Sequence, residues 1–387
     1  MAKEAGRSTD MTSIVALFTD VLPAGGVQRA GRHVAAVTAK FASDRGMNTR
    51  FLSLNDPQGL HTVHVGSLEF SVSGYARSKI QFANAALRAA GRKPAMVIAL
   101  HPHLAPVVWI MRARARKFRS VVFTHGVEVW QPLGWPRGAA LRGADLLIGP
   151  SADTVQHLIS EQHISPGKAQ RLPWGLDPEF EARIAAAGLL PPAPPPGFPP
   201  KGNIILTVGR WDSVEKYKGA DTLISALPRV LKTAPSASLV LVGDGDDRPR
   251  LEQLARNLGV SDRAHFLHGL TPEQLFACYA NCDVFALPSS GEGFGLVFLE
   301  AMAHAKPVIG GAHGGIPDIV EHGTTGLLVS HGDTERLAQS LESLFSDPSR
   351  AVEMGARGKD RLEAMFSFAQ FQSSLARILD TALAKEH

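Results

Sequence analysis

Two glutamates in the second half of the chain stand where a sheet meets a helix. The segment 287–309, LPSSGEGFGLVFLEAMAHAKPVI, holds Glu292 and Glu300. A strand is predicted to end at Pro288 and a helix to begin near Leu296, so Glu292 lies in a glycine-broken loop and Glu300 a turn or so inside the helix. Helix-start N–H groups suit a diphosphate, and carboxylates accept hydrogen bonds from the vicinal hydroxyls of a sugar or a ribose. Alternatively, the two are unrelated surface carboxylates on a helix-capping loop.

Basic residues follow another predicted strand. The segment 204–219, IILTVGRWDSVEKYKG, reads as a buried strand ending at a glycine, followed by Arg210, Lys216 and Lys218. Cations just beyond a strand end can neutralise the charge that develops on a departing diphosphate. Each of them can also be a solvated surface residue.

The first half offers a glycine pair and a histidine at similar places. GGVQR, 25–29, follows the first predicted strand at a helix start, where glycines let the backbone approach a phosphate. It does not form the GxGxxG fingerprint, so a nicotinamide cofactor is poorly supported. His125, in FTHGVE, follows the fourth strand and either contacts a sugar or packs at the end of the sheet.

Short apolar runs alternate with longer amphipathic stretches on both sides of a proline-rich segment, which predicts α/β architecture. Strands are expected at 13–18, 50–54, 96–100, 120–124 and 146–149, and then at 203–208, 238–242, 265–267, 284–287, 307–309 and 326–329. We expect two doubly wound, Rossmann-like domains that face each other across a cleft, with ligands beyond the carboxyl ends of the strands.

The domain boundary is placed by proline. Residues 189–200, LLPPAPPPGFPP, hold seven prolines and predict an extended linker. The N-terminal domain is then 1–188, joined by a C-terminal helix at 366–387, and the second domain is 201–365.

Charge is shared unevenly between the two halves. Residues 1–186 carry 22 Lys/Arg against 13 Asp/Glu, whereas the remainder carries 18 against 23. The run WIMRARARKFR, 109–119, places five cations beside a tryptophan, which suggests peripheral contact with an anionic membrane or simply a solvated helix end.

The remaining bulk features favour a cytoplasmic enzyme. No apolar run reaches the length of a membrane span, the first ten residues are polar, and the two cysteines, Cys278 and Cys282, imply no disulfide framework. Asp244-Gly245-Asp246 matches a metal-holding DxD pattern, but turn chemistry explains it here. We therefore expect neither a metal nor a cofactor, and no nucleic-acid partner.

Several of these motifs together resemble the GT4 family of retaining glycosyltransferases, which have the GT-B fold. The motifs occur in the family's order over almost the whole chain: GGVQR, THGVE, GLDPEF, VGR with a following KG, VGDG, EGFGLVFLE and GGIPDIV. The resemblance implies transfer of a hexose-type sugar from a UDP or GDP sugar to a glycan or lipid-linked acceptor of cell-envelope or exopolysaccharide synthesis. It also implies that the acceptor hydroxyl arrives on the face that the diphosphate leaves, without a protein nucleophile.

The same resemblance assigns the site residues. Arg210 and Lys218 would contact the diphosphate, with Lys218 preferred to Lys216 because it precedes a glycine. Glu292 would hold the donor sugar, Glu300 the ribose, and His125 would lie beside the transferred sugar. The other donor-binding positions that it implies are Gly26, Leu270, Phe294, Gly295 and Leu296.

Other functions remain open on the same two-domain plan. The chain could be a catalytically inactive sugar-nucleotide sensor or subunit, a sugar-nucleotide epimerase, or a phosphorylase, although no motif marks a Schiff-base lysine.

Overall fold

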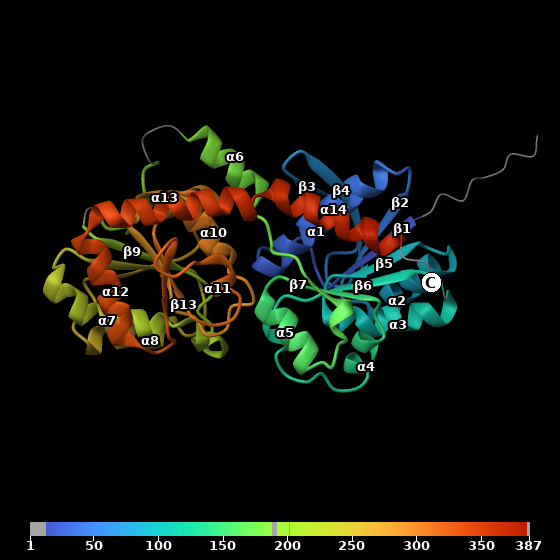
Figure 1. The fold of residues 1–387 in the computed structure, drawn as a ribbon, viewed down its shortest axis with the longest axis horizontal. Coiled ribbons are helices and arrows are strands. Elements are labelled where there is room, and N and C mark those ends of the chain that lie inside the picture. The colour runs from blue at the N-terminus through green and yellow to red at the C-terminus, as the bar shows by residue number, and fades with distance from the viewer. Residues whose placement is uncertain (1–12, 116, 188–191, 201, 385–387) are drawn as a thin grey trace, which may run out of the picture. The chain divides into compact units, whose positions relative to one another are not determined.

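The computed structural model describes residues 13–115, 117–187, 192–200 and 202–384, and these form two compact units. Unit 1 takes in the described residues of Met1–Gly149, Val155–Leu172 and Gln372–His387. Unit 2 takes in those of Pro150–Thr154 and Pro173–Phe371. Each unit is a sheet covered by helices (Figure 1).

Unit 1 contains an eight-stranded sheet of order β3-β4-β2-β1-β5-β6-β7-β8. All neighbouring pairs are parallel except β3 and β4, which form an antiparallel pair at one edge. The strands are β1 Ser13–Phe18, β2 Asn48–Ser53, β3 Gly59–Val65, β4 Leu68–Gly74, β5 Met96–Ala99, β6 Arg119–Phe123, β7 Leu146–Gly149 and β8 Ala169–Arg171.

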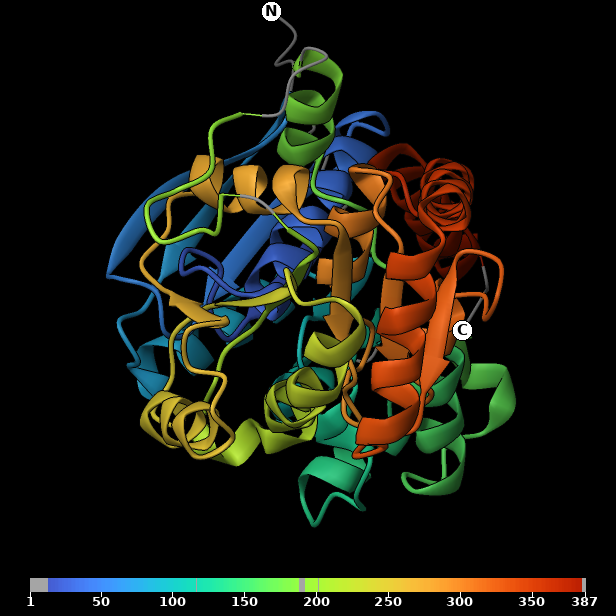
Figure 2. The same ribbon diagram turned by 90° about the vertical axis from the view of Figure 1, so that its left-hand side faces the viewer.

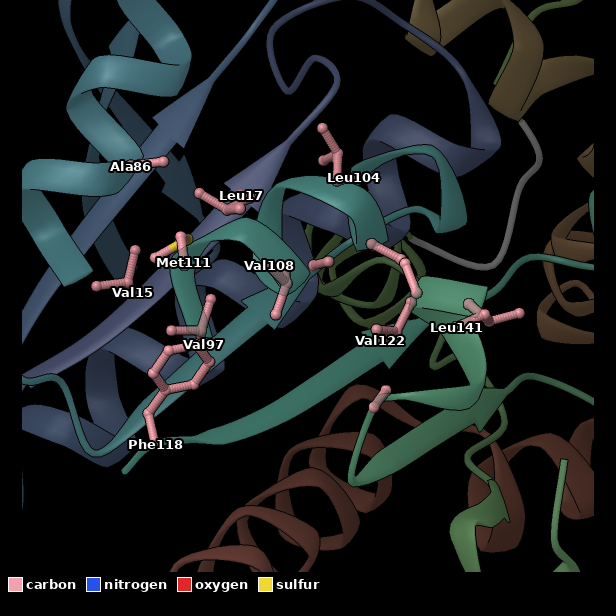
Figure 3. Packing of buried hydrophobic residues seen from close by; sticks show 14 of the residues in the cluster. Val15, Leu17, Ala86, Val97, Leu104, Val108, Met111, Phe118, Val122 and Leu141 are labelled. Atoms are coloured by element: carbon pink, nitrogen blue, oxygen red, sulfur yellow. The ribbon is translucent and has the colours of Figure 1, made fainter. Parts of the chain in front are cut away.

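The core of unit 1 follows from the two-residue period of its strands. Val15 and Leu17 face one side of the sheet and pack with Val108 and Met111 of the covering helices (Figure 3). The helices within unit 1 are α1 Gly26–Ser43, α2 Lys79–Gly91, α3 Ala105–Arg114 and α4 Arg137–Arg142. Central strands such as SIVALF are apolar on both faces because helices cover both faces of the sheet.

Unit 2 contains a six-stranded, wholly parallel sheet of order β11-β10-β9-β12-β13-β14. Its strands are β9 Ile204–Val208, β10 Ser238–Val242, β11 Ala264–Leu267, β12 Val284–Leu287, β13 Val308–Gly311 and β14 Gly326–Val329. Because every strand runs the same way, the loops that follow all six meet at one edge of the sheet.

Helices cover both faces of the unit 2 sheet. In the ribbon, α7, α8 and α12 lie on one side of the strands, and α10 and α13 on the other (Figure 1 and Figure 2). The helices of this unit are α6 Pro178–Ala186, α7 Ala220–Thr233, α8 Arg248–Asn257, α9 Pro272–Asn281, α10 Leu296–Ala303, α11 Ile316–Ile319, α12 Thr334–Ser346 and α13 Pro348–Met365. The predicted doubly wound α/β architecture is confirmed for each unit.

Two helices connect the ranges of the two units along the chain. Both α5 (Ala152–Ser160) and α14 (Phe368–Ala384) begin in the range of unit 2 and end in that of unit 1. The predicted linker at 189–200 lies partly outside the described residues. Its described part, 192–200, has neither helix nor strand and belongs to unit 2.

Each strand that the sequence predicts has a counterpart, and unit 1 has three more. The additional strands are β3, β4 and β8. The first two carry a readable signal, because Val63, Val65, Phe70 and Val72 are buried and alternate with more exposed residues.

Candidate functional site

The carboxyl edge of the unit 2 sheet carries the predicted basic residues. Arg210 follows β9 directly after Gly209, and a short 3-10 helix, Ser213–Lys218, leads into α7. Gly219 at the start of α7 has φ 77°, and a Cβ there would lie 2.8 Å from the carbonyl oxygen of Pro288. Glycine is therefore needed after Lys218 for the chain to pass against the loop that follows β12.

Tyr217 fixes this segment against the same loop. A Cβ on Gly291 would lie 2.5 Å from the Tyr217 ring, so the ring packs directly on the glycine. The backbone N–H of Ser290 donates to the carbonyl oxygen of Tyr217 at 2.8 Å. These contacts bring Lys218 beside the loop that holds Glu292.

A single carboxylate bonds both cations. The Lys218 ammonium lies 2.7 Å from Oε2 of Glu215, and the Arg210 guanidinium donates from Nη2 to Oε1 of the same residue. Lys218 also donates to the Arg210 carbonyl oxygen at 3.2 Å. The side chains of Lys218 and Glu215 are 13% and 11% exposed, whereas that of Arg210 is 66% exposed. Lys216, in contrast to Lys218, is exposed.

Asp212 contributes a second acceptor for Arg210. Its Oδ2 lies 3.0 Å from Nε of the guanidinium. The hydrogen bond with Glu215 is the largest influence on the pKa of Arg210 and raises it. The cation is thus held by two carboxylates at the end of β9.

The pKa values of Glu215 and Glu292 are shifted in opposite directions. Burial alone would raise the pKa of Glu215, but hydrogen bonds from Arg210 and Lys218 outweigh it and lower the pKa. Burial raises the pKa of Glu292; the Lys218 cation opposes that shift and the Glu215 charge adds to it. Glu292 therefore lies within the electrostatic reach of Lys218 and Glu215.

The predicted loop-to-helix segment is confirmed, and it separates the two glutamates. Gly295 has φ 105° and caps α10 without a side-chain hydrogen bond, so the helix starts at Leu296. Glu300, inside α10, is only 2% exposed and accepts a 2.6 Å hydrogen bond from the Tyr279 hydroxyl on α9. Its carboxylate is thus oriented by a buried tyrosine.

The other predicted donor-binding positions of unit 2 flank these elements. Phe294 is buried, with its ring 5.9 Å from that of Phe366. Leu270 lies after β11 and precedes Thr271, which caps α9 in a reciprocal pair with Gln274. Both residues are placed at the carboxyl edge of the sheet.

Unit 1 presents histidines at its own carboxyl edge. His125 follows β6, and its Nε2 lies 2.7 Å from the Leu100 carbonyl oxygen, so Nε2 is the protonated nitrogen. His101, after β5, accepts the His103 backbone N–H at Nδ1 over 3.1 Å. The His101 ring lies 5.8 Å from that of His125 and 4.4 Å from that of His103.

The surroundings of His101 and His103 favour uncharged rings. Burial, followed by the neighbouring His125 and His103, lowers the pKa of His101 to about 3. Burial and Arg137 lower the pKa of His103 as well. Gly26, the first residue of α1, is placed at a helix start after β1, as the sequence predicted.

In the DxD pattern, 244–246, and in the basic segment 109–119, several side chains pair with other residues of the protein. Asp246 accepts hydrogen bonds from the backbone N–H and hydroxyl of Ser213. No group of three or more His, Cys, Asp or Glu side chains that could hold a metal occurs in the described part of the chain.

In the basic segment 109–119, Arg112 and Arg119 both lie within ion-pair distance of Asp145. No described helix is long and apolar enough to cross a bilayer.

Three residues that contact the predicted site residues were not predicted from the sequence: His101, Glu215 and Tyr279. His101 follows its strand as His125 follows the next, so the same rule could have found it. Glu215 lies between the two predicted phosphate ligands in the sequence, and its acidity was the available signal. No sequence signal marked Tyr279, because its hydrogen-bond partner Glu300 is 21 residues away in the chain.

Two family models match successive parts of the chain. They are described as Glycosyltransferase Family 4, over residues 25–180, and Glycosyl transferases group 1, over residues 193–361.

Individual proteins extend this similarity. A GDP-mannose-dependent alpha-(1-6)-phosphatidylinositol monomannoside mannosyltransferase of Mycobacterium tuberculosis is 35% identical over 284 residues, which are 69% of this chain and 71% of the relative. A D-inositol 3-phosphate glycosyltransferase of Stackebrandtia nassauensis is 28% identical over 397 residues, with 92% and 88% of the two chains covered. Among solved structures, Anabaena HepE in complex with UDP shares the fold with a TM-score of 0.70 at 20% identity, over 96% of this chain and 100% of that one.

Proposed function

This chain belongs to the GT4-type glycosyltransferases of GT-B fold, and from that premise we propose that it transfers a hexose from a nucleoside-diphosphate sugar, with retention of configuration, to a glycan or lipid-linked acceptor of the cell envelope. The observation that carries the proposal is the pair of cations, Arg210 and Lys218, held beside Glu292 at the carboxyl edge of the unit 2 sheet.

Arg210 and Lys218 would contact the diphosphate of the donor. A departing diphosphate gains negative charge as the glycosidic bond breaks, and fixed cations stabilise that charge in the transition state. The low exposure of the Lys218 side chain, 13%, supports this role because it strengthens the interaction of the ammonium with an anion. Arg210 adds a planar guanidinium that can bind two phosphate oxygens at once.

The loop and helix after β12 would hold the rest of the donor. Glu292 would accept hydrogen bonds from the sugar, and Glu300, oriented by Tyr279, from the ribose. Backbone atoms near Phe294, Gly295 and Leu296 would complete the phosphate pocket, and those near Leu270 would contact the base. Gly26 and His125 of unit 1 would serve the diphosphate and the transferred sugar.

We assign no residue as a covalent nucleophile. Glu292 lies in the charge cluster of Lys218, and Glu300 is hydrogen-bonded inside α10, which supports ligand roles rather than the paired acid and nucleophile of a glycosidase. The acceptor hydroxyl would then attack on the face from which the diphosphate departs. No metal is part of this proposal.

The relatives suggest which substrates to test first. The mycobacterial relative is named for GDP-mannose and a phosphatidylinositol mannoside, and the Stackebrandtia relative for inositol 3-phosphate. We propose GDP-mannose as the first donor and inositol-containing phosphates or lipids as the first acceptors, with UDP sugars as the second set.

The test is a thermal-shift screen against GDP, UDP and ADP sugars, followed by transfer with the donor that stabilises the chain most. The anomeric configuration of the product is then read by NMR. Retention of the donor configuration is expected. An inverted product would overturn the assigned mechanism, and binding without turnover would favour a sugar-nucleotide sensor.

Contact with an anionic membrane is proposed for unit 1. Trp109 and Ile110 on α3 are 46% and 55% exposed, in the more basic half of the chain. Flotation with liposomes should show more binding to anionic than to neutral vesicles, and less after Trp109→Ala with Ile110→Ala. Equal, negligible binding to both vesicles would remove the proposal.

A further inference from the structure

Glu215 is the one residue found to bond both proposed phosphate ligands in the described part of the chain. Its Oε1 accepts from Arg210 Nη2, and its Oε2 lies 3.2 Å from Arg210 Nε and 2.7 Å from the Lys218 ammonium. The carboxylate is 11% exposed, and the backbone at Glu215 leaves the helical region, with φ −112° and ψ 26°, inside the segment Ser213–Lys218.

We propose that Glu215 is an exchange residue of the donor site: its carboxylate occupies the two cations when no diphosphate does, gives them up when the donor binds, and returns to help release the nucleoside diphosphate product. This inference rests on the proposed function, because it takes Arg210 and Lys218 as the diphosphate ligands.

The chemistry of the contact supports exchange. A carboxylate and a phosphate both present pairs of closely spaced anionic oxygens, and both accept charge-assisted hydrogen bonds from Arg and Lys. Two of the three ammonium hydrogens of Lys218 are directed to Glu215 and to the Arg210 carbonyl. A phosphate that approaches Lys218 therefore competes with Glu215 for the same cation.

The balance of charge argues against Glu215 staying in place. Asp212 and Glu215 already pair with Arg210, and Glu292 lies close enough to Glu215 for that charge to raise its pKa. A diphosphate added to this set would bring its own charge to two cations whose charge Asp212 and Glu215 already balance. Removing one carboxylate from the cations relieves the resulting repulsion.

Arg210 has the freedom that exchange requires. Its side chain is 66% exposed, so the guanidinium can change partners without opening the packed core. Lys218, at 13% exposed, is the more fixed of the two and keeps its bond to the Arg210 carbonyl. Movement is thus expected at Glu215 and Arg210 rather than at the sheet.

The test compares Glu215→Gln with the unaltered chain by calorimetry against GDP, UDP and inorganic pyrophosphate. The amide keeps the size of the side chain but removes the competing charge, so the diphosphate that binds best should bind about five- to tenfold more tightly. Product inhibition in the transfer assay should strengthen by a similar factor. The matched control is Glu353→Gln, which removes a carboxylate paired with Arg357 on α13 and should leave affinity unchanged.

The outcomes are separable. Equal or weaker binding by Glu215→Gln, with binding by the unaltered chain intact, would overturn exchange and make Glu215 a residue that holds the cations for the ligand. Absence of binding by both chains to all three probes would overturn the proposed function and the inference with it. If Glu215→Gln does not fold, Glu215→Asp should still tighten binding, by a smaller factor, because the shorter side chain cannot reach both cations.

Discussion

The carboxyl edges of the two sheets differ in the chemistry they present. At the edge of unit 2, Arg210 and Lys218 form a cluster of ion pairs with Asp212 and Glu215. At the edge of unit 1, burial favours neutral rings at His101 and His103, and the pKa of His101 is lowered to about 3. Similar α/β sheets thus supply a charged site suited to phosphate and an uncharged site suited to hydroxyl groups.

The difference arises from partners rather than from burial alone. Glu215 is poorly exposed but stays ionised because two cations bond it, which lowers its pKa. His101 has imidazole neighbours, so burial disfavours its charged form without compensation. Substitution of individual residues should therefore change the charge difference between the two sheet edges in predictable ways.

The largest effect is expected from Arg210→Ala. Loss of a cation that stabilises developing charge should lower kcat by about 10²–10³-fold, with a smaller change in donor affinity. Steady-state transfer from the selected donor measures both quantities. The control is Arg229→Ala, which removes a guanidinium paired with Glu335 and Glu342 in the same unit. A change confined to the Michaelis constant would contradict the role.

Glu300→Ala should have the next largest effect. Removal of a charged hydrogen-bond acceptor should weaken nucleoside-diphosphate binding by about 1–3 kcal/mol, as calorimetry can measure. The 2′-deoxy and 3′-deoxy nucleotides serve as controls, because the variant should bind at least one of them as well as the ribonucleotide. Unchanged affinity would remove the ribose role.

The lowered pKa of His101 should make the free energy of unfolding depend on pH. The folded-state pKa of His101 lies below its ordinary value, so the unfolded chain binds the extra proton and stability falls as pH drops from about 6.5 towards 3. Between pH 7.5 and 5 the residue should cost about 1–2 kcal/mol of unfolding free energy. His101→Asn should reduce this loss in urea titrations, whereas His64→Asn on exposed β3 should not. Identical pH profiles for all three chains would contradict the assignment.

The smallest effect is expected on the stability of unit 2. Burial raises the pKa of Glu292, so ionisation of this group at neutral pH opposes folding. Glu292→Gln should therefore raise the melting temperature at pH 7.5 by about 2 °C while transfer slows. A lower melting temperature would mean that the charge of Glu292 stabilises the fold through Lys218.

Much of the fold could be predicted because both sheets are built from buried apolar strands with sharp ends. All six strands of unit 2 were predicted, and α10 begins at Leu296, directly after the glycine-containing loop that follows β12, as predicted. The β3–β4 pair was missed although its buried residues alternate with more exposed ones, because each strand has only two buried apolar side chains, Val63 and Val65 in β3 and Phe70 and Val72 in β4. Strand β8 has only three residues and no buried side chain, so no pattern could reveal it.

The site was predictable only in part, because sequence order does not give side-chain partners. The choice of Lys218 over Lys216, made because Lys218 precedes a glycine, stays a prediction. Glu215 was not assigned, because the sequence does not predict the non-helical backbone at this residue inside the segment Ser213–Lys218. Similarly, Tyr279 on α9 and Glu300 on α10 meet in a tertiary contact 21 residues apart in the sequence.

The central claim is that Arg210 and Lys218 bind the diphosphate of a sugar nucleotide. It is tested most directly by calorimetric titration of GDP and UDP into the unaltered chain, the Arg210→Ala, Lys218→Ala double variant and the Arg229→Ala control. The account predicts that the unaltered chain and the control bind one of these nucleotides equally well, and that the double variant loses at least about 100-fold in affinity. Equal binding by all three chains would contradict it.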